Sequence, residues 1–437
     1  MMHSATNIYN SQQSSLLINF YYDYMILNIK IHKTNAPFKT KGLTIMKSFY
    51  KFLTITILLV IQSHEVFAQS DLEVFGFFQA TLGKVKGNYG AVANVPKEIF
   101  GFDKLKLVEK EEDNLNPSIQ QLNLLFRKEM SPNITAWVNL EILGNYNSSL
   151  KWGGISLQEA WANYQVSDAF NVKLGLLIPK FAYLNEIKNR FPLIPYITRP
   201  LIYESAIPTI NIYDYIPERA FAQISGYFPV GDLTLDYAAF FGQSERTYIV
   251  GPDGGSVGGT SVDTTNFKLW GGRIGASYGD LRFGISGSFD KKNLQATLQE
   301  DVPRTRLAFD LGYSVFNFFF EGEYIAVMLD AKNTTEDQDK LFYYGTLGYN
   351  FTDDLYGYGT YSYMEDKGDD VLGTGMTGYI LGLGYKLMDS VVLKASYTTY
   401  SIEEGSFPYV INPQLPPLDV NVQLDYKAYQ LGVSILF

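Results

Sequence analysis

The chain ends in the stretch VQLDYKAYQLGVSILF, residues 422–437. Counting back from Phe437, Ile435, Val433, Leu431 and Tyr429 fall on one face, whereas Ser434, Gly432 and Gln430 fall on the other. This alternation predicts a strand in a wall with lipid on one side and water on the other. The edges of such a strand need partners, because a membrane offers no water to unpaired backbone groups. The stretch therefore predicts a closed β-barrel.

The ending also resembles the last strand of bacterial outer-membrane β-barrels. Those strands commonly finish in Phe after aromatic or apolar residues at alternating positions, and the barrel assembly machinery recognises them. The matching residues here are Phe437, Ile435 and Val433, continued by Leu431 and Tyr429. The resemblance implies a location in the cell outer membrane, with membrane lipid and the assembly machinery as partners.

The composition favours one large barrel over several soluble domains. The 437 residues include 33 Tyr, 30 Phe and 38 Gly but no Cys. Tyr and Phe suit the interface girdles of a barrel, and Gly suits crowded or bent positions in its wall. A soluble array of aromatic-rich β-sandwiches is the alternative.

Residues 46–68 have the features of a secretory signal peptide. Lys47 and Lys51 precede an apolar core, and Val66-Phe67-Ala68 forms a cleavage site before Gln69. The apolar core is too short to span a bilayer as a helix. We therefore expect a mature barrel domain over residues 69–437.

Residues 1–45 precede the predicted signal peptide and are interpreted as an upstream extension from a misassigned start. The three histidines, His3, His32 and His64, all precede Gln69. The expected mature chain therefore lacks both His and Cys, which excludes Ser-His-Asp and Cys-His catalysis and His or Cys metal sites. We expect no enzymatic activity, no catalytic residues, no cofactor, no metal and no nucleic-acid partner.

From Leu72 onward, strand-like runs of about ten residues alternate with connectors that are in turn short and long. The seven short connectors are 131–133, 167–169, 229–232, 279–280, 316–317, 352–354 and 389–390. The eight long connectors are 85–118, 145–154, 178–218, 243–267, 291–303, 330–340, 365–375 and 402–421. Together they predict a transmembrane antiparallel all-β barrel of about sixteen strands, with both termini on the periplasmic, short-turn side.

The third long connector, residues 178–218, is the predicted functional centre. It carries six prolines and many aromatic residues. A stiff, apolar loop of this length is suited to fold inward and pack against a wall. In general porins the third extracellular loop narrows the lumen, so we expect an inward-folded third loop here. An outward lid and a subunit-contact loop are the alternatives.

Charged side chains on the lumen side are the candidate selectivity residues. The candidates in and just after the loop are Lys180, Lys188, Arg190, Arg199 and Arg219. The alternation places further cations on the pore wall: Arg127, Lys173, Arg273, Arg282, Arg306, Lys386 and Lys394. The acidic candidates on the lumen side are Glu141, Asp236, Asp310, Glu321 and Glu323.

Pore selectivity arises from rings or ladders of one sign of charge. Arg273, Arg282 and Arg306 fall on three neighbouring predicted strands and predict a basic ladder for anions. The alternative is that these cations are ordinary solvated charges of a water-filled barrel, in a chain with a net charge of −10.

Residues 157–242 resemble the phosphate-selective porin O and P family of Gram-negative bacteria. The pieces that carry the resemblance are LQEAWANY (157–164), VKLG (172–175), PKF (179–181), PER (217–219), QISG (223–226) and YAAFFG (237–242). The resemblance implies homotrimers and passive diffusion of anions such as phosphate. Arg219 matches the Arg that closes the family's constriction loop, whereas Ala220 departs from the glycine that would follow.

These observations predict a passive outer-membrane porin for small hydrophilic solutes or ions. The runner-up is a non-conducting structural or adhesive barrel that binds partners through its extracellular loops. The loop at 178–218 separates the two, because an outward-pointing loop would favour adhesion.

Overall fold

A computed structural model describes most of the chain that follows the predicted signal peptide. The described residues are 72–94, 104–147, 151–204, 214–243, 249–250, 256–257, 268–293, 300–335, 337–369, 372–402, 405–409 and 418–437. Residues 1–45 and the signal peptide at 46–68 lie outside them, so both interpretations stay predictions. None of the helices in the described ranges has the length and apolar character needed to cross a membrane.

The described residues are organised as one large antiparallel sheet. The first half contains β1 (Glu73–Asn94), β2 (Lys104–Ser131), β3 (Ile134–Asn147), β4 (Lys151–Ser167), β5 (Phe170–Leu177), β6 (Ala220–Val230), β7 (Leu233–Gln243) and β10 (Lys268–Tyr278). The second half contains β11 (Leu281–Asn293), β12 (Asp301–Val315), β13 (Phe318–Leu329), β14 (Lys340–Asn350), β15 (Leu355–Asp366), β16 (Met376–Met388), β17 (Val391–Ile402) and β19 (Leu418–Leu436).

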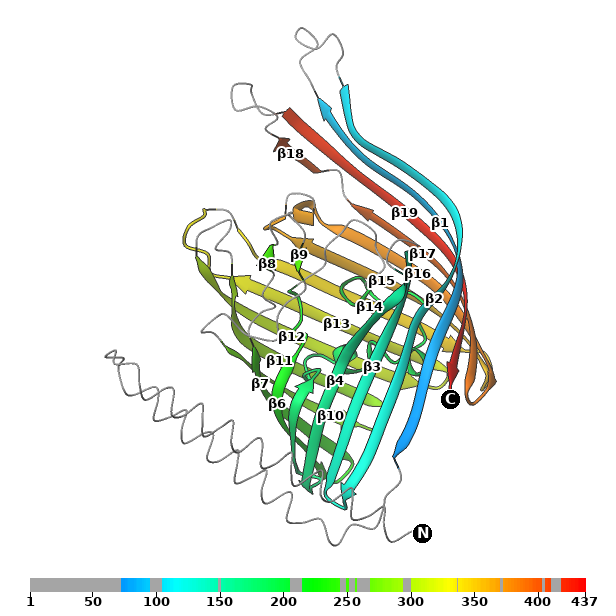
Figure 1. Cartoon of the computed structure of the whole chain (residues 1–437), viewed down its shortest axis with the longest axis vertical. Coiled ribbons are helices and arrows are strands. Elements are labelled where there is room, and N and C mark those ends of the chain that lie inside the picture. The colour runs from blue at the N-terminus through cyan, green and yellow to red at the C-terminus, as the bar shows by residue number, and fades with distance from the viewer. Residues whose placement is uncertain are drawn as a thin grey trace, which may run out of the picture. The chain divides into compact units, whose positions relative to one another are not determined.

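The sheet closes on itself because β1 pairs with both β2 and β19 (Figure 1). The closure reaches the last residue: Gly76 N–H donates to Phe437 O at 2.8 Å, and Phe437 N–H donates to Gly76 O at 2.9 Å. Each remaining strand in the ring pairs with its two neighbours, which leaves no free sheet edge in the described wall. The predicted barrel of about sixteen antiparallel strands is confirmed.

The turns explain why the number of strands could be predicted from the sequence. Each of the seven predicted short connectors is a tight turn between consecutive strands, for example Gly279-Asp280 between β10 and β11. Gly231 and Gly279 adopt positive φ angles of 64° and 55°, which favour glycine in turns.

Three predicted long connectors were wrong in extent, because the strand ladder continues through residues that were assigned to loops. β1 runs to Asn94 and β2 begins at Lys104, well inside the predicted 85–118 connector. In the connector at 145–154, β3 runs to Asn147 and β4 begins at Lys151. In the last connector, β18 (Gly405–Tyr409) pairs with the start of β19. In Figure 1, β1, β2 and β19 rise beyond the neighbouring strands.

The two faces of the wall differ as the alternation predicts. Outward side chains are large, apolar and more than half exposed, including Trp270, Ile274, Ile285, Leu381 and Leu431. An exposed apolar surface that surrounds a closed barrel suits contact with lipid. Inward positions carry polar or buried side chains, among them Gln79, Asn123, Ser286, Thr346 and Ser434.

The segment between β5 and β6 contains three short helical turns. They are α4 (Leu184–Ile187), η1 (Phe191–Leu193) and η2 (Leu201–Tyr203). Gly175 lies just before this segment with a φ of 128°, and a Cβ there would meet the Ala160 carbonyl oxygen at 2.2 Å. Only glycine fits this bend, which starts the departure of the chain from the wall. Outside the ring, β8 (Ile249–Val250) pairs with β9 (Ser256–Val257), and η3 (Leu372–Thr374) precedes β16.

Candidate pore constriction

The described residues between 178 and 219, called loop 3 below, lie against the lumen side of the wall. Their hydrogen bonds reach strands that are far apart in the ring. On one side of the ring, Ala182 N–H donates to Ser286 Oγ of β11 at 2.9 Å. On the other, Gln121 Nε2 of β2 donates to the Asn189 carbonyl at 3.1 Å, and Thr198 Oγ1 donates to Gln430 Oε1 of β19 at 2.5 Å.

An apolar seam joins loop 3 to the wall formed by β13–β17. Phe181, Leu184 and Phe191 of the loop are fully buried. They share one cluster with side chains that point inward from the wall, including Phe342, Met364, Ile380 and Tyr400. Tyr196 meets Tyr358 edge to face with ring centroids 5.3 Å apart. Because the seam removes many apolar groups from water, it favours an inward position of the loop.

Two glutamates on β13 bind the loop through polar contacts within this seam. Glu323 accepts hydrogen bonds from the backbone N–H groups of Tyr183 and Leu184 at 2.9 and 2.6 Å, and from Tyr203 Oη at 2.6 Å. The first two donors precede or begin α4 and have no partner inside the helix. Glu321 accepts a short hydrogen bond from Tyr196 Oη. Both carboxylates therefore hold the loop rather than face open water.

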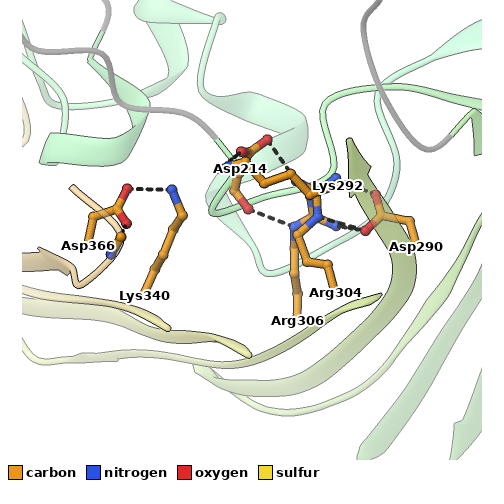
Figure 2. A network of polar contacts seen from close by, with 8 residues as sticks. Asp214, Asp290, Lys292, Arg304, Arg306, Lys340 and Asp366 are labelled. Atoms are coloured by element: carbon orange, nitrogen blue, oxygen red, sulfur yellow. Dashed lines mark hydrogen bonds and ion pairs between the residues drawn. The ribbon is translucent and has the colours of Figure 1, made fainter. Parts of the chain in front are cut away.

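A network of charged side chains binds the end of loop 3 to the β11–β15 wall (Figure 2). Asp214 lies 2.8 Å from Arg304 Nη1 and 2.9 Å from Lys292 Nζ. Its backbone carbonyl accepts a hydrogen bond from Arg306 Nε at 2.8 Å. Asp214 has a φ of 76°, which is uncommon for a residue other than glycine, and it lies in a bend of the chain at the point where it meets these cations.

Asp290 and Asp366 complete the network. Asp290 accepts two hydrogen bonds of 2.7 Å from the Arg304 guanidinium and one of 3.1 Å from Arg306. Lys340 forms a short ion pair with Asp366 and lies 5.5 Å from the ring centre of Tyr215. Each cation drawn in Figure 2 thus has a carboxylate partner, as required for buried charges.

The Asp214 carboxyl should titrate only in strong acid. Burial alone would raise its pKa, but Arg304, Lys292, Lys340 and Arg306 together hold that pKa well below the usual range. A depressed folded-state pKa stabilises the protein above the unfolded value, about 3.9, and this contribution is lost as the pH falls below it.

Replacing Asp214 with Asn is expected to lower the free energy of unfolding by about 1.5–3 kcal/mol at pH 7, the range for hydrogen bonds to charged groups. The difference from the wild type should be the same at pH 5 and should shrink below pH 4. Urea unfolding in lipid vesicles at several pH values measures it. Asp337→Asn is the control, since the Lys367–Asp337 pair of 2.7 Å is well exposed, and no measurable change is expected. An Asp214→Asn effect that grows in acid would contradict the ion-pair account.

The three arginines of the predicted ladder are each matched by acidic groups. Arg273 bonds to Asp236 at 2.6 Å and to Asp310 at 2.8 Å. Arg282 lies 3.5 Å from Glu321, and Arg306 belongs to the network above. They do come from neighbouring strands, β10, β11 and β12, but their charges are largely compensated.

The other predicted wall cations have separate environments. Lys394 is buried beneath loop 3, and Lys173 lies 4.6 Å from the ring centre of Trp161. Arg127 pairs with Glu73 at 3.1 Å, and Lys386 pairs with Asp389 at 2.8 Å beside the turn that follows β16.

The opposite edge of loop 3 is charged and faces β3–β6. Lys173 of β5 lies within electrostatic reach of Lys180, Glu186 and Arg190 of the loop, and of Glu159 on β4. The Glu141 carboxylate of β3 lies within electrostatic reach of three cations, Arg199, Lys188 and Arg219. Arg199 also braces the loop internally, donating to Asn189 Oδ1 at 2.8 Å and to the Lys188 carbonyl at 3.1 Å. Six cations and three carboxylates are named here, and Glu204 lies 3.9 Å from Arg199 as a fourth carboxylate, so cations remain in excess among these groups.

Sequence reasoning missed Asp214 and Asp290 as anchors. Asp290 could have been identified, because it lies an even number of positions from Arg282 on the same strand and therefore faces the lumen as well. Asp214 lies in a loop without periodicity, so no such pattern marks it. Within the described residues, no group of three or more His, Cys, Asp or Glu side chains is arranged to hold a metal ion.

The chain matches no protein-family profile, and no curated protein matches it. Among solved structures, the anion-selective porin from Comamonas acidovorans is similar, with a TM-score of 0.50 and 14% identity over 84% of this chain and 100% of that chain. A loop L8 deletion mutant of OmpT from Vibrio cholerae has a TM-score of 0.48 and 11% identity, over 84% of this chain and 99% of the other. The DcaP channel of Acinetobacter baumannii has a TM-score of 0.47 and 14% identity, over the same shares.

At such low identity the first of these structures shows the fold alone. The fold is that of an outer-membrane porin, and the apolar outer face of the closed ring is the surface that such a barrel presents to lipid. The chain is therefore an outer-membrane β-barrel.

Proposed function

We propose that the protein is a passive channel for small hydrophilic solutes or ions, with a pore narrowed by loop 3. The proposal rests on the difference between the two edges of loop 3. One edge packs against β11–β17 and β19 through apolar and hydrogen-bonded contacts, and the other presents charged side chains to β3–β6. A barrel of this size is too wide for wall side chains to fill, so water and solutes would pass along the charged edge.

The distribution of charge around the lumen also bears on ion selectivity. Arg273, Arg282 and Arg306 are compensated by acids and offer little net field to a passing ion. The path along β3–β6 carries an excess of cations, which favours anions. We therefore assign anion preference to Lys173, Lys180 and Arg190 rather than to the predicted ladder. Phosphate as solute, and a homotrimeric assembly, remain expectations from the family resemblance.

The test is the reversal potential of single channels under a salt gradient. Protein purified from the outer membranes of a porin-deficient host is inserted into planar bilayers. Wild-type channels are expected to prefer anions, and the combined Lys173→Glu, Lys180→Glu and Arg190→Glu variant to prefer cations.

Lys367→Glu is the matched control, because the Lys367 side chain is solvent-exposed and outside the barrel strands. It should leave the reversal potential unchanged. A wild-type channel that prefers cations would overturn the assignment of anion selectivity but would leave the proposed channel function standing.

The second candidate is a non-conducting barrel that binds partners through its extracellular face. The spread of loop 3 contacts around the ring, from β6 through β11 to β19 and β2, supports only the non-conducting part of this candidate, because it obstructs the lumen. The inward position of the loop is evidence against adhesion through it. Folded protein that gives no current in bilayers would favour it over the channel.

A further inference from the structure

Lys394 on β17 is a buried lumen cation whose hydrogen bonds, among the residues that the structure describes, all go to main-chain oxygens. Its ammonium donates to the carbonyl groups of Phe191, Ile194 and Tyr196 at 2.7, 2.8 and 3.3 Å. The residue is 4% exposed. Three donors are all that a lysine ammonium has, so each is used on one short stretch of loop 3.

This pattern differs from that of the other buried lumen cations. Arg304, Arg306 and Lys340 each have a carboxylate partner. Within the described part of the chain, no carboxylate interacts electrostatically with Lys394. Since moving an unpaired ammonium out of water is costly, the carbonyl oxygens must supply the compensation.

The sequence of the bound stretch explains why it needs an outside donor. Residues 191–196 read FPLIPY, with Pro192 and Pro195. Proline has no backbone N–H, so a turn with two prolines has more carbonyl acceptors than backbone donors. The carbonyls of Phe191, Ile194 and Tyr196 converge on one point, and Lys394 supplies the donors there.

We propose that Lys394 is a positioning residue that holds residues 191–196 of loop 3 against β17 and thereby sets the width of the pore. The inference rests on the proposed channel function. In this arrangement the lysine does not attract solutes, although its place on the lumen side of a strand suggests that role. It acts through the loop and would affect channel size more than ion preference.

Chemical rescue provides a sharp test, because the chain has no cysteine. Lys394→Cys introduces a single thiol, which is alkylated in the unfolded protein before refolding into vesicles. With 2-bromoethylamine the thiolate displaces bromide and yields a side chain that ends in an ammonium, close to lysine in length. With iodoacetamide the thiolate displaces iodide and yields an uncharged amide.

We expect the aminoethylated protein to have the wild-type single-channel conductance. The amide-bearing protein and Lys394→Met should show a severalfold larger or strongly flickering conductance, with little shift in reversal potential. Lys427→Met is the matched control from the neighbouring strand β19, since its partner Asp425 is exposed, and its conductance should equal that of the wild type. Equal conductance in all variants would overturn the inference.

Limited trypsin digestion reads the loop position without any current. Lys188 and Arg190 immediately precede the bound stretch, and cleavage there should be faster in Lys394→Met than in the wild type and Lys427→Met. If no variant, wild type included, conducts, the channel function fails. Faster cleavage in Lys394→Met would then still support the anchoring of the loop, and unchanged cleavage would reject it.

Discussion

Replacing Asp290 with Ala is expected to lower the free energy of unfolding by about 3–5 kcal/mol, the range for breaking a buried ion pair by removing one partner. The Asp290 side chain is only 2% exposed and accepts hydrogen bonds from both Arg304 and Arg306. Its loss would leave the Arg306 guanidinium with the Asp214 carbonyl at 2.8 Å as its main acceptor. Urea unfolding of the refolded barrel in vesicles measures the change.

A double-mutant cycle separates the lost interaction from the orphaned charge. Adding Arg306→Met to Asp290→Ala should recover part of the stability, because the uncompensated cation is then gone. Asp425→Ala is the control, since the Lys427–Asp425 pair of 2.9 Å is more than two-fifths exposed on both sides. It should cost at most about 1 kcal/mol, as exposed pairs do. Additive effects of the Asp290 and Arg306 changes would contradict the network.

Replacing Glu323 with Ala is expected to lower the free energy of unfolding by about 3 kcal/mol or more, because each buried donor left without an acceptor costs about 1–3 kcal/mol. Three donors depend on this carboxylate: the N–H groups of Tyr183 and Leu184 and the hydroxyl of Tyr203. Urea unfolding measures the loss, and faster trypsin cleavage in the loop should accompany it.

Glu323→Gln is the matched control. Its carbonyl oxygen can still accept from the Tyr183 and Leu184 N–H groups, and its amide can donate to Tyr203 Oη. It should therefore lose less than half as much stability as Glu323→Ala. Equal losses in the two variants would show that the negative charge, rather than the acceptor geometry, stabilises the loop.

The barrel was predictable because its signals are local. Turn residues such as Gly279-Asp280 and the two-residue alternation of strands lie within short windows of sequence. The strand extensions were missed for the same reason. Residues 109–113 read EKEED, a run of charges without alternation that favours a loop, yet their backbone pairs with residues 86–90 of β1. Charge alone therefore did not mark the end of a strand that continues beyond the apolar band.

The candidate site was predictable only in part. The prolines identified loop 3, and parity identified Lys394, Arg306 and Glu323 as lumen residues. Their partners could not be read from the sequence, because Asp214 meets Arg304 across 90 positions of chain and Tyr203 meets Glu323 across 120. Such pairs depend on strand register and on the path of a loop without periodicity.

The reach of loop 3 also constrains how the barrel is assembled. Its contacts to Gln79 and Gln430 span 118 and 232 positions of chain, and these two side chains lie on β1 and β19, the strands that close the ring. The full set of these contacts needs both the first and the last strand in place, and contacts of such sequence separation are slow to form. A newly closed barrel would thus have a wider lumen than the finished one, and the seating of loop 3 would be the last step, which narrows the pore to its final width.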